Sequence, residues 1–337
     1  MNRYLLIMCA LAVSLWTAQP CGATPRKVLN DFDGDGKTDV AIYKPASGLW
    51  MVFLIGSLTV TNVTTWAGPN YLPAPGDYDG DGKADFMVFN SAIGGWYGKL
   101  SRTDTFVGGG FGPPGSWPVC GDYDGDGTTD LAVYEPTTAM WHAVSLNKGW
   151  YAAIHWGGMG DFRSWENPQT YTVLPMPFDY NQDGIDDFAV YYRGWSMSDS
   201  GWYILYSSGG STYYPWGSSG SLPVPGLYQV LMANAPRGVC VYKITSAEWD
   251  IPYREHFHEG TYGQTLPVPG GDYDGNGFDD NTVYNYVTGE WTIICNTGGA
   301  EVVGRTVIGG GFGGSGWVPG NMYSTIYNLA RYSPHPW

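Results

Sequence analysis

One stretch of nine residues decides how this chain is interpreted. Residues 31–39 read Asp-Phe-Asp-Gly-Asp-Gly-Lys-Thr-Asp and run directly into the apolar segment Val40-Ala41-Ile42-Tyr43. Carboxylates stand at positions 1, 3, 5 and 9, and the glycine at position 6 permits a sharp turn that folds them toward one point. The backbone carbonyl of position 7 can add another oxygen. A flexible loop with only oxygen ligands suits Ca²⁺ better than Mg²⁺ or a soft metal, so the stretch predicts a calcium-binding loop that leads into a strand.

The same pattern recurs along the chain. Intact copies begin at Asp31, Asp77, Asp122, Asp179 and Asp272, and two eroded copies without carboxylates align at Leu227–Asn234 and Asn321–Asn328. A second landmark, a tryptophan about 20 residues after each loop begins, recurs at Trp50, Trp96, Trp141, Trp202, Trp249 and Trp291. Self-similarity at a fixed period near 45 residues predicts a repeat architecture.

Each repeat predicts four short β-strands. In the third repeat we expect them at Trp117–Cys120, Leu131–Glu135, Trp141–Ser145 and Tyr151–Trp156. The second strand is apolar on both faces, which requires sheets stacked face to face. Four-stranded sheets stacked radially are propeller blades. The sequence therefore predicts an all-β propeller of six or seven blades, with the acidic loop between the first and second strands of most blades. Six full repeats and a C-terminal stub of two strands would form one domain over residues 24–337.

The predicted metal ligands occupy positions 1, 3, 5, 7 and 9 of the five intact loops, where position 7 contributes its carbonyl. They are Asp31, Asp33, Asp35, Lys37 and Asp39; Asp77, Asp79, Asp81, Lys83 and Asp85; Asp122, Asp124, Asp126, Thr128 and Asp130; Asp179, Asn181, Asp183, Ile185 and Asp187; and Asp272, Asp274, Asn276, Phe278 and Asp280. The loop is not an EF-hand, because position 12 is an apolar residue and not a bidentate glutamate. About five Ca²⁺ ions are expected, in a structural role, since every repeat would use its ion in the same way.

The charge distribution agrees with this interpretation. The chain has 337 residues, 31 acidic against 16 basic, and a net charge of −15. Eighteen of the acids occupy these loop positions, and the remaining 13 are outnumbered by Lys and Arg. Carboxylates packed together without a cation repel one another. The acidic balance also argues against a nucleic-acid-binding protein, which would show basic patches.

The N-terminus predicts export. Arg3 precedes an apolar run from Leu5 to Trp16 and the small residues of Cys21-Gly22-Ala23, so residues 1–23 resemble a secretory signal peptide. We expect a secreted protein, extracellular or periplasmic, with no membrane span after the signal is removed. Three cysteines remain, Cys120, Cys240 and Cys295. They do not imply a disulfide framework, and each is expected to be a small buried hydrophobe.

The five loops, the period and the turns Gly109-Gly110-Phe111-Gly112 and Gly310-Gly311-Phe312-Gly313 resemble FG-GAP/VCBS repeats, as found in bacterial secreted proteins and in the integrin α-chain propeller. The resemblance covers about Val28 to Tyr327. It implies a calcium-bound β-propeller outside the cell that serves adhesion, ligand binding or as an accessory module. The two eroded loops depart from the pattern and should not bind metal.

Three functions remain open from the sequence. The first is a secreted binding or adhesion module for a glycan or an extracellular protein, for which no catalytic or cofactor-binding residue is evident. The second is a polysaccharide lyase or glycoside hydrolase, and the third is a structural surface protein. Two insertions in the fourth repeat, residues 160–171 and 193–201, are candidate ligand loops with Trp165 and Trp195, and they hold the acids Asp161, Glu166 and Asp199. His256 and His258 lie on one face of a predicted strand and could bind a transition metal, although a solvated edge strand is the simpler interpretation.

Overall fold

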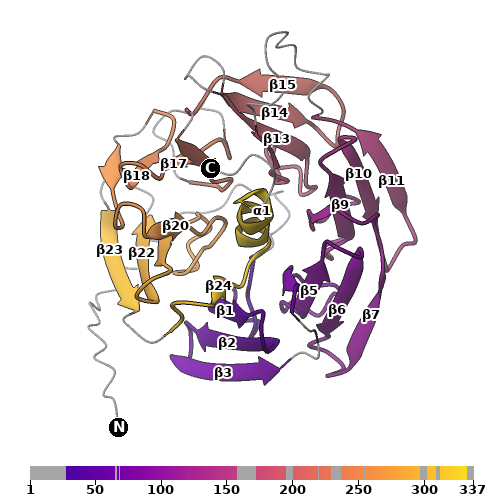
Figure 1. Ribbon diagram of the computed structural model, residues 1–337, viewed down its shortest axis with the longest axis horizontal. Helices are drawn as coiled ribbons and strands as arrows, with labels where there is room; N and C mark the ends of the chain where they lie inside the picture. The colour runs from indigo at the N-terminus through magenta and orange to yellow at the C-terminus, as the bar shows by residue number, and fades with distance from the viewer. Residues whose placement is uncertain are drawn as a thin grey trace.

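The computed structural model describes residues 28–64, 67, 69–157, 172–194, 200–218, 220–228, 237–253, 256–296, 302–308 and 312–331. Within these residues the strands form six sheets of four antiparallel strands, arranged as the blades of a ring (Figure 1). The prediction of an all-β propeller is confirmed, and of the two expected blade numbers the structure has six. The predicted signal peptide and both insertions, apart from Arg193–Gly194 and Ser200–Gly201, lie outside the described residues.

The strands of the first three blades follow the repeats closely. Blade 1 contains β24 (Val318–Pro319), β1 (Val40–Lys44), β2 (Leu49–Leu54) and β3 (Thr59–Thr64). Blade 2 contains β4 (Leu72–Pro73), β5 (Phe86–Asn90), β6 (Gly95–Lys99) and β7 (Phe106–Gly110). Blade 3 contains β8 (Trp117–Pro118), β9 (Leu131–Glu135), β10 (Met140–Val144) and β11 (Tyr151–His155).

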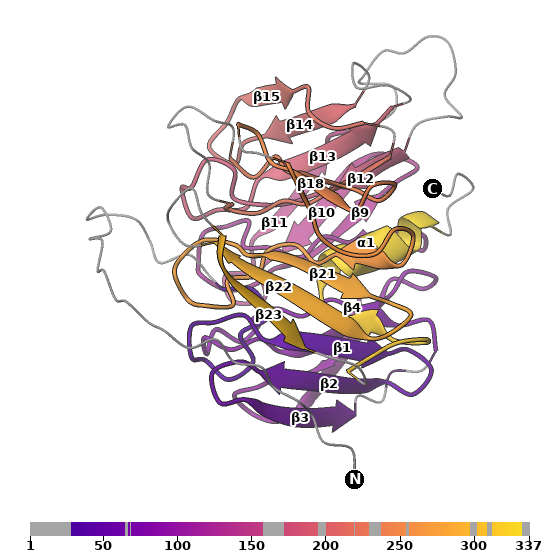
Figure 2. The ribbon, with the colours of Figure 1, turned by 90° about the vertical axis from the view of Figure 1, so that its left-hand side faces the viewer.

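The other three blades repeat this plan. Blade 4 contains β12 (Thr172–Pro175), β13 (Phe188–Arg193), β14 (Gly201–Leu205) and β15 (Ser211–Tyr214). Blade 5 contains β16 (Ser221–Pro223), β17 (Val241–Lys243), β18 (Glu248–Asp250) and β19 (Phe257–His258). Blade 6 contains β20 (Thr265–Pro267), β21 (Asn281–Asn285), β22 (Glu290–Asn296) and β23 (Val302–Ile308). The side view in Figure 2 shows β1, β2 and β3 side by side in blade 1.

The landmark tryptophans hold the blades together. Trp50, Trp141, Trp202, Trp249 and Trp291 are fully buried, and each lies against the tyrosine opposite it on the second strand, as in the Tyr191–Trp202 pair with ring centroids 5.3 Å apart. The second strands are buried on both faces, as the apolar runs predicted. The repeated aromatic residues are therefore blade packing.

The C-terminus differs from the prediction. Residues 317–332 were expected to supply two strands, but they supply one strand, β24, and a helix, α1 (Met322–Arg331). β24 pairs with β1 through Tyr43–Val318 and Ile42–Pro319, so the end of the chain completes the first blade and closes the ring. Asn321, which looked like an eroded loop, caps the helix: its Oδ1 accepts a hydrogen bond of 2.7 Å from the backbone N–H of Ser324.

Helix α1 occupies the centre of the ring (Figure 1) and contacts the innermost strands β4, β8 and β12. Tyr323, Ile326 and Tyr327 are buried. The helix also bonds the proline carbonyls of three blades: Thr325 donates to Pro73 (2.5 Å), Tyr323 to Pro177 (2.6 Å) and Tyr327 to Pro223. Helix α1 is thus hydrogen-bonded to blades 2, 4 and 5 at the centre of the ring.

Candidate metal centre

The first aspartate of each intact loop organises the turn. In the first loop, Oδ1 of Asp31 accepts hydrogen bonds from the N–H groups of Gly34 (2.7 Å) and Asp35 (3.2 Å), and Oδ2 accepts one from Gly36 (2.8 Å). The loops that begin at Asp77, Asp122 and Asp272 repeat all three bonds. Asp179 repeats two of them. A carboxylate that receives several N–H groups is held in one orientation, so these loops have a defined shape.

The aspartate at position 9 connects the loop to its blade through two hydrogen bonds in most of the intact loops. Oδ2 of Asp39 accepts from the Phe32 N–H (2.8 Å), and Oδ1 accepts from the Ile55 N–H (2.9 Å) at the turn after β2. Asp85, Asp187 and Asp280 make the corresponding pairs of bonds. Asp130 keeps only the bond from Tyr123, and its Oδ1 is buried without a hydrogen-bond partner. That oxygen has a free acceptor site inside the loop.

Three loops bring positions 1, 3 and 9 together. The groups are Asp31 with Asp33 and Asp39, Asp77 with Asp79 and Asp85, and Asp122 with Asp124 and Asp130, and in each group one oxygen from every carboxylate lies within 4.8 Å of the others. The aspartates of position 5 lie outside these groups. In all three loops the position 5 carboxylate accepts the N–H of position 7, as Asp35 does from Lys37 (2.9 Å).

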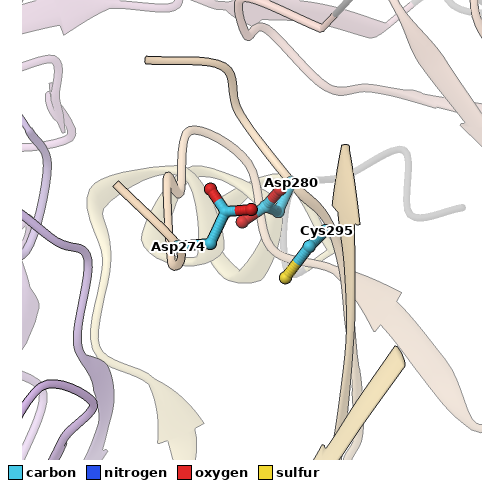
Figure 3. Close-up of side chains that lie close together, drawn as sticks. All are labelled: Asp274, Asp280 and Cys295. Atoms are coloured by element: carbon cyan, nitrogen blue, oxygen red, sulfur yellow. The ribbon is translucent and has the colours of Figure 1, made fainter. Parts of the chain in front are cut away.

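The loops with asparagine substitutions differ. In the fourth blade Asn181 Nδ2 donates to Asp183 (2.9 Å), and among the described residues Asp179, Asp183 and Asp187 form no such group. In the sixth blade the group consists of Asp274, Asp280 and Cys295, without Asp272 (Figure 3). Cys295 was expected to be a core residue, but it is only partly buried and lies beside the carboxylates; Cys120 and Cys240 are buried as predicted. All three are free cysteines.

Burial changes the protonation of the position 9 carboxylates. Each is almost completely inaccessible to solvent. Loss of solvation raises the pKa of Asp85 and Asp187 to about 6, the pKa of Asp39 and Asp130 to about 7, and the pKa of Asp280 to about 8. The metal-free loops therefore hold carboxylates that are costly to ionise near neutral pH, which a bound cation would relieve.

Consecutive loops are bonded to one another around the ring. The N–H of position 8 donates to the carbonyl of position 1 in the preceding repeat, at distances of 2.6–3.1 Å. The pairs are Thr38 with Asp272, Ala84 with Asp31, Thr129 with Asp77, Asp186 with Asp122 and Asp279 with Leu227. The position 7 side chain also lies over the position 4 glycine of the preceding loop. A Cβ on Gly80, whose φ is +72°, would meet Thr128 at 2.9 Å, so glycine is required there.

The other candidate residues from the sequence do not join this site. His256 pairs with Glu248 (3.4 Å) and Asp250 (3.2 Å), whereas His258 contacts the Ser246 carbonyl (3.0 Å), so the two histidines do not converge. Trp165, Trp195, Asp161, Glu166 and Asp199 lie outside the described residues.

One open depression lies on blade 2. It has a volume of about 500 Å³ and is lined by Tyr71, Ile93, Tyr97, Phe106 and the glycines 108–110. The rings of Tyr97 and Phe106 are stacked with centroids 6.0 Å apart. Sequence reasoning missed this surface. The signal was available in the run Gly108-Gly109-Gly110, which leaves the second half of β7 without side chains.

The fold and the loops together define a class, a six-bladed β-propeller with acidic loops on successive blades. Residues 31–88 match the family model of the FG-GAP-like repeat, so the chain carries such a repeat, and its six blades are consistent with an FG-GAP repeat propeller. No curated protein sequence matches the chain. No helix among the described residues is long and apolar enough to cross a membrane.

Several solved structures align with this chain at low identity and low TM-score. A putative 6-phosphogluconolactonase from Bacteroides uniformis is 11% identical, with a TM-score of 0.45 over 80% of this chain and 82% of that chain. BBS1N in complex with ARL6DN is 13% identical, with a TM-score of 0.41 over 85% and 81%. Virginiamycin B lyase from Staphylococcus aureus is 9% identical, with a TM-score of 0.39 over 74% of each chain. Such scores are too low to carry anything about function to this chain.

Proposed function

We propose that the protein is a secreted, calcium-stabilised β-propeller that binds a glycan or an extracellular protein. The observation that carries the proposal is the third loop. There Asp122, Asp124 and Asp130 place one oxygen each within 4.8 Å of the others, and Oδ1 of Asp130 is buried without a hydrogen-bond partner. A buried carboxylate oxygen with no donor is costly unless a cation binds it.

The donor set favours calcium. Positions 1, 3 and 9 of the first three loops supply only carboxylate oxygens, which hard cations prefer. Position 5 and the position 7 carbonyl complete the proposed ligand sets, which extend to the loops at Asp179 and Asp272. Bound Ca²⁺ would neutralise the carboxylates and stabilise the loop bonds between blades. At about 1 mM calcium, a site with a Kd of 10⁻⁴–10⁻³ M adds roughly 0.4–1.4 kcal/mol.

Calorimetric titration of the metal-free protein with CaCl₂ tests this proposal. We expect uptake of several ions with Kd values in the range of about 10⁻⁴–10⁻³ M and a higher melting temperature in calcium than in EDTA. The matched control is Asp130→Asn, which keeps an oxygen for the Tyr123 N–H but lacks the second carboxylate oxygen. It should lose uptake of about one ion. Absence of heat and identical melting curves in calcium and EDTA would contradict the proposal.

The depression on blade 2 is the proposed ligand surface. Phe106 is 40% exposed and stacks on Tyr97, and a Cβ added at Gly109 would meet no atom within 4 Å, so the floor is open. Flat aromatic faces beside the three consecutive glycines of β7 suit a sugar ring or a planar peptide segment. A glycan array with the calcium-loaded protein tests this. Binding that is lost in Phe106→Ala supports it, whereas an array and pull-down at background level count against a binding module.

Secretion is proposed from Arg3, the apolar run Leu5–Trp16 and the small residues before Thr24. N-terminal sequencing of the protein recovered from the culture medium or periplasm should begin at Thr24. A mature protein that retains Met1 and stays with the cytosolic fraction would contradict this part of the proposal.

A further inference from the structure

Three polar side chains on blade 3 are hydrogen-bonded in series. Oε1 of Glu135, at the end of β9, lies 2.8 Å from Nε2 of His142 on β10. Nδ1 of His142 lies 2.8 Å from the hydroxyl oxygen of Tyr151 at the start of β11. Thr138 donates to the other oxygen of Glu135 (2.9 Å), which fixes the carboxylate. We call Glu135, His142 and Tyr151 the blade 3 relay.

The strand register brings these residues to one face of the sheet. His142 lies opposite Val133 and Ala153, Tyr151 lies opposite Val144, and Glu135 lies opposite Met140. Residues two apart on a strand share a face, so the relay crosses three strands diagonally.

Propeller packing does not require this combination. The same register positions hold Asn90, Tyr97 and Phe106 in blade 2. In blade 1 they hold Lys44, Met51 and Val60. Both blades form without any such relay. The relay is therefore a property of blade 3 and not of the repeat.

The proposal uses the tautomer of His142 in which Nε2 carries the proton. An ionised Glu135 would select this tautomer, because a carboxylate without a proton can only accept. In the neutral imidazole Nδ1 is then an acceptor, and the Tyr151 hydroxyl must donate to it. The side chains of Glu135 and His142 are only 18% and 22% exposed, whereas Tyr151 is 56% exposed. A half-buried base oriented by a carboxylate thus contacts a hydroxyl that solvent can reach.

We propose that Tyr151 is a nucleophile toward the acyl carbon of neutral esters, with His142 as its general base and Glu135 as a positioning residue. A hydroxyl bonded to a base, and a base bonded to an orienting group, is the arrangement that activates nucleophiles. Tyr151 Oη forms a bond to the carbonyl carbon, and its proton passes to Nδ1 of His142. The bond from that carbon to the alcohol oxygen breaks, and the alcohol leaves with the proton, so the products are an acyl-tyrosine and an alcohol.

The charged groups around the blade 3 relay favour a neutral ester as the proposed substrate. The Glu135 carboxylate next to His142 disfavours an anionic donor such as a phosphoryl ester. Glycosyl transfer needs two carboxyl groups that flank the bond, and Glu135 is bound to His142 and Thr138.

The test uses the calcium-loaded full chain and p-nitrophenyl acetate at pH 8. Nitrophenolate release is followed by absorbance, and acetylated peptides are quantified by mass spectrometry. Tyr253 and Tyr262 are internal comparators, because they are 56% and 70% exposed and neither bonds a histidine among the described residues. General-base catalysis contributes about 10²–10⁴-fold, so Tyr151 should be acetylated at least about tenfold faster than either comparator.

Variants separate the roles. His142→Phe should bring Tyr151 down to the rate of the comparators, and the aromatic Tyr97 at the equivalent position of blade 2 shows that a ring fits there. Glu135→Gln should lower the rate, and Glu135→Asp should restore part of it. Equal rates for the three tyrosines in the unmodified protein, which needs no variant to fold, would overturn the proposal. So would a Tyr151 rate that His142→Phe leaves unchanged in a variant with an unaltered melting curve.

Discussion

Acid should stabilise the metal-free protein more than it stabilises the calcium-loaded protein. Burial raises the pKa of Asp130 from the ordinary 3.8 to about 7, so between these values the folded state binds a proton that the unfolded state does not. Stability therefore increases as pH falls through the folded pKa, which is opposite to the usual behaviour of a paired aspartate. Calcium needs the ionised carboxylates and its contribution should disappear over the same range of pH.

The magnitude follows from the pKa values. For one carboxylate with a pKa near 7, lowering the pH from 7.5 to 5.5 should stabilise the metal-free fold by about 2 kcal/mol. Asp39 and Asp130 have that pKa, Asp85 and Asp187 have about 6, and Asp280 has about 8. Together they should raise the melting temperature in EDTA by on the order of 10 °C. In excess calcium the melting temperature should rise less or stay level, because protons and calcium compete for the same carboxylates.

Differential scanning calorimetry at both pH values, with EDTA and with CaCl₂, measures the four melting temperatures. Asp130→Asn is the matched control, because an amide does not titrate there but can still accept the Tyr123 N–H. In this variant the stabilisation of the metal-free fold between pH 7.5 and 5.5 should be smaller by about 2 kcal/mol, the contribution of Asp130. The difference distinguishes protonation of Asp130 from a general reduction of negative charge. A melting temperature in EDTA that falls between pH 7.5 and 5.5, or a calcium increment equal at both pH values, would refute the reasoning.

Four further outcomes are expected. Calcium titration should be cooperative, with a Hill coefficient above 1, because position 8 of each loop bonds position 1 of the preceding loop; independent identical sites would contradict this. A chain ended after Gly320 loses the buried Tyr323, Ile326 and Tyr327 and should be destabilised by about 5 kcal/mol in denaturant unfolding. Tyr327→Phe, which keeps the ring and loses the bond to Pro223, should cost about 1 kcal/mol. Trp202→Ala should cost about 3–5 kcal/mol, against about 0.5 kcal/mol or less for the exposed Tyr262→Ala. Gly80→Ala should lower the melting temperature by several degrees, because the new Cβ is strained at a positive φ and would also clash with Thr128. Gly82→Ala has the same strain at a φ of +88°, but its Cβ would contact no atom within 4 Å, so it should lower the melting temperature less.

The repeat length of about 45 residues and the recurring order of motifs within each repeat were enough to predict the blades. A loop, an apolar strand and a tryptophan at constant spacing specify one supersecondary unit, and such a unit cannot bury both faces of its strand alone. The fully buried Trp202 and the inaccessible β13 are the direct result. The choice between six and seven blades depended on the C-terminus, where the repeat pattern ends.

The helix was missed because Asn321 aligned with position 1 of the loops. A better signal was present, since residues 322–333 contain neither glycine nor proline in a chain with 50 glycines. Asparagine before such a segment is a good helix cap. The composition of these twelve residues carried more information than the alignment of one eroded motif.

The blade 3 relay was missed for a different reason. The partners of His142 are Glu135 and Tyr151, which are seven and nine residues away in the sequence. Only the register of the two hairpins makes them neighbours. Register can be inferred from the landmark Trp141, which lies opposite Tyr134, so this contact was within reach of sequence reasoning.

The eroded fifth loop separates two roles that the motif combines. Leu227 replaces the first aspartate, yet its carbonyl still accepts the Asp279 N–H, and its own N–H is bound by the Asp279 carboxylate. Asp186 bonds the Asp122 N–H in the same way at 2.8 Å. The contact between blades therefore uses the backbone carbonyl of position 1 and the N–H of position 8 in the next repeat, to which Asp186 and Asp279 add a side-chain bond. The proposed metal binding uses the side chains of positions 1, 3 and 9. Because these requirements fall on different atoms, a repeat can lose its carboxylates without opening the ring.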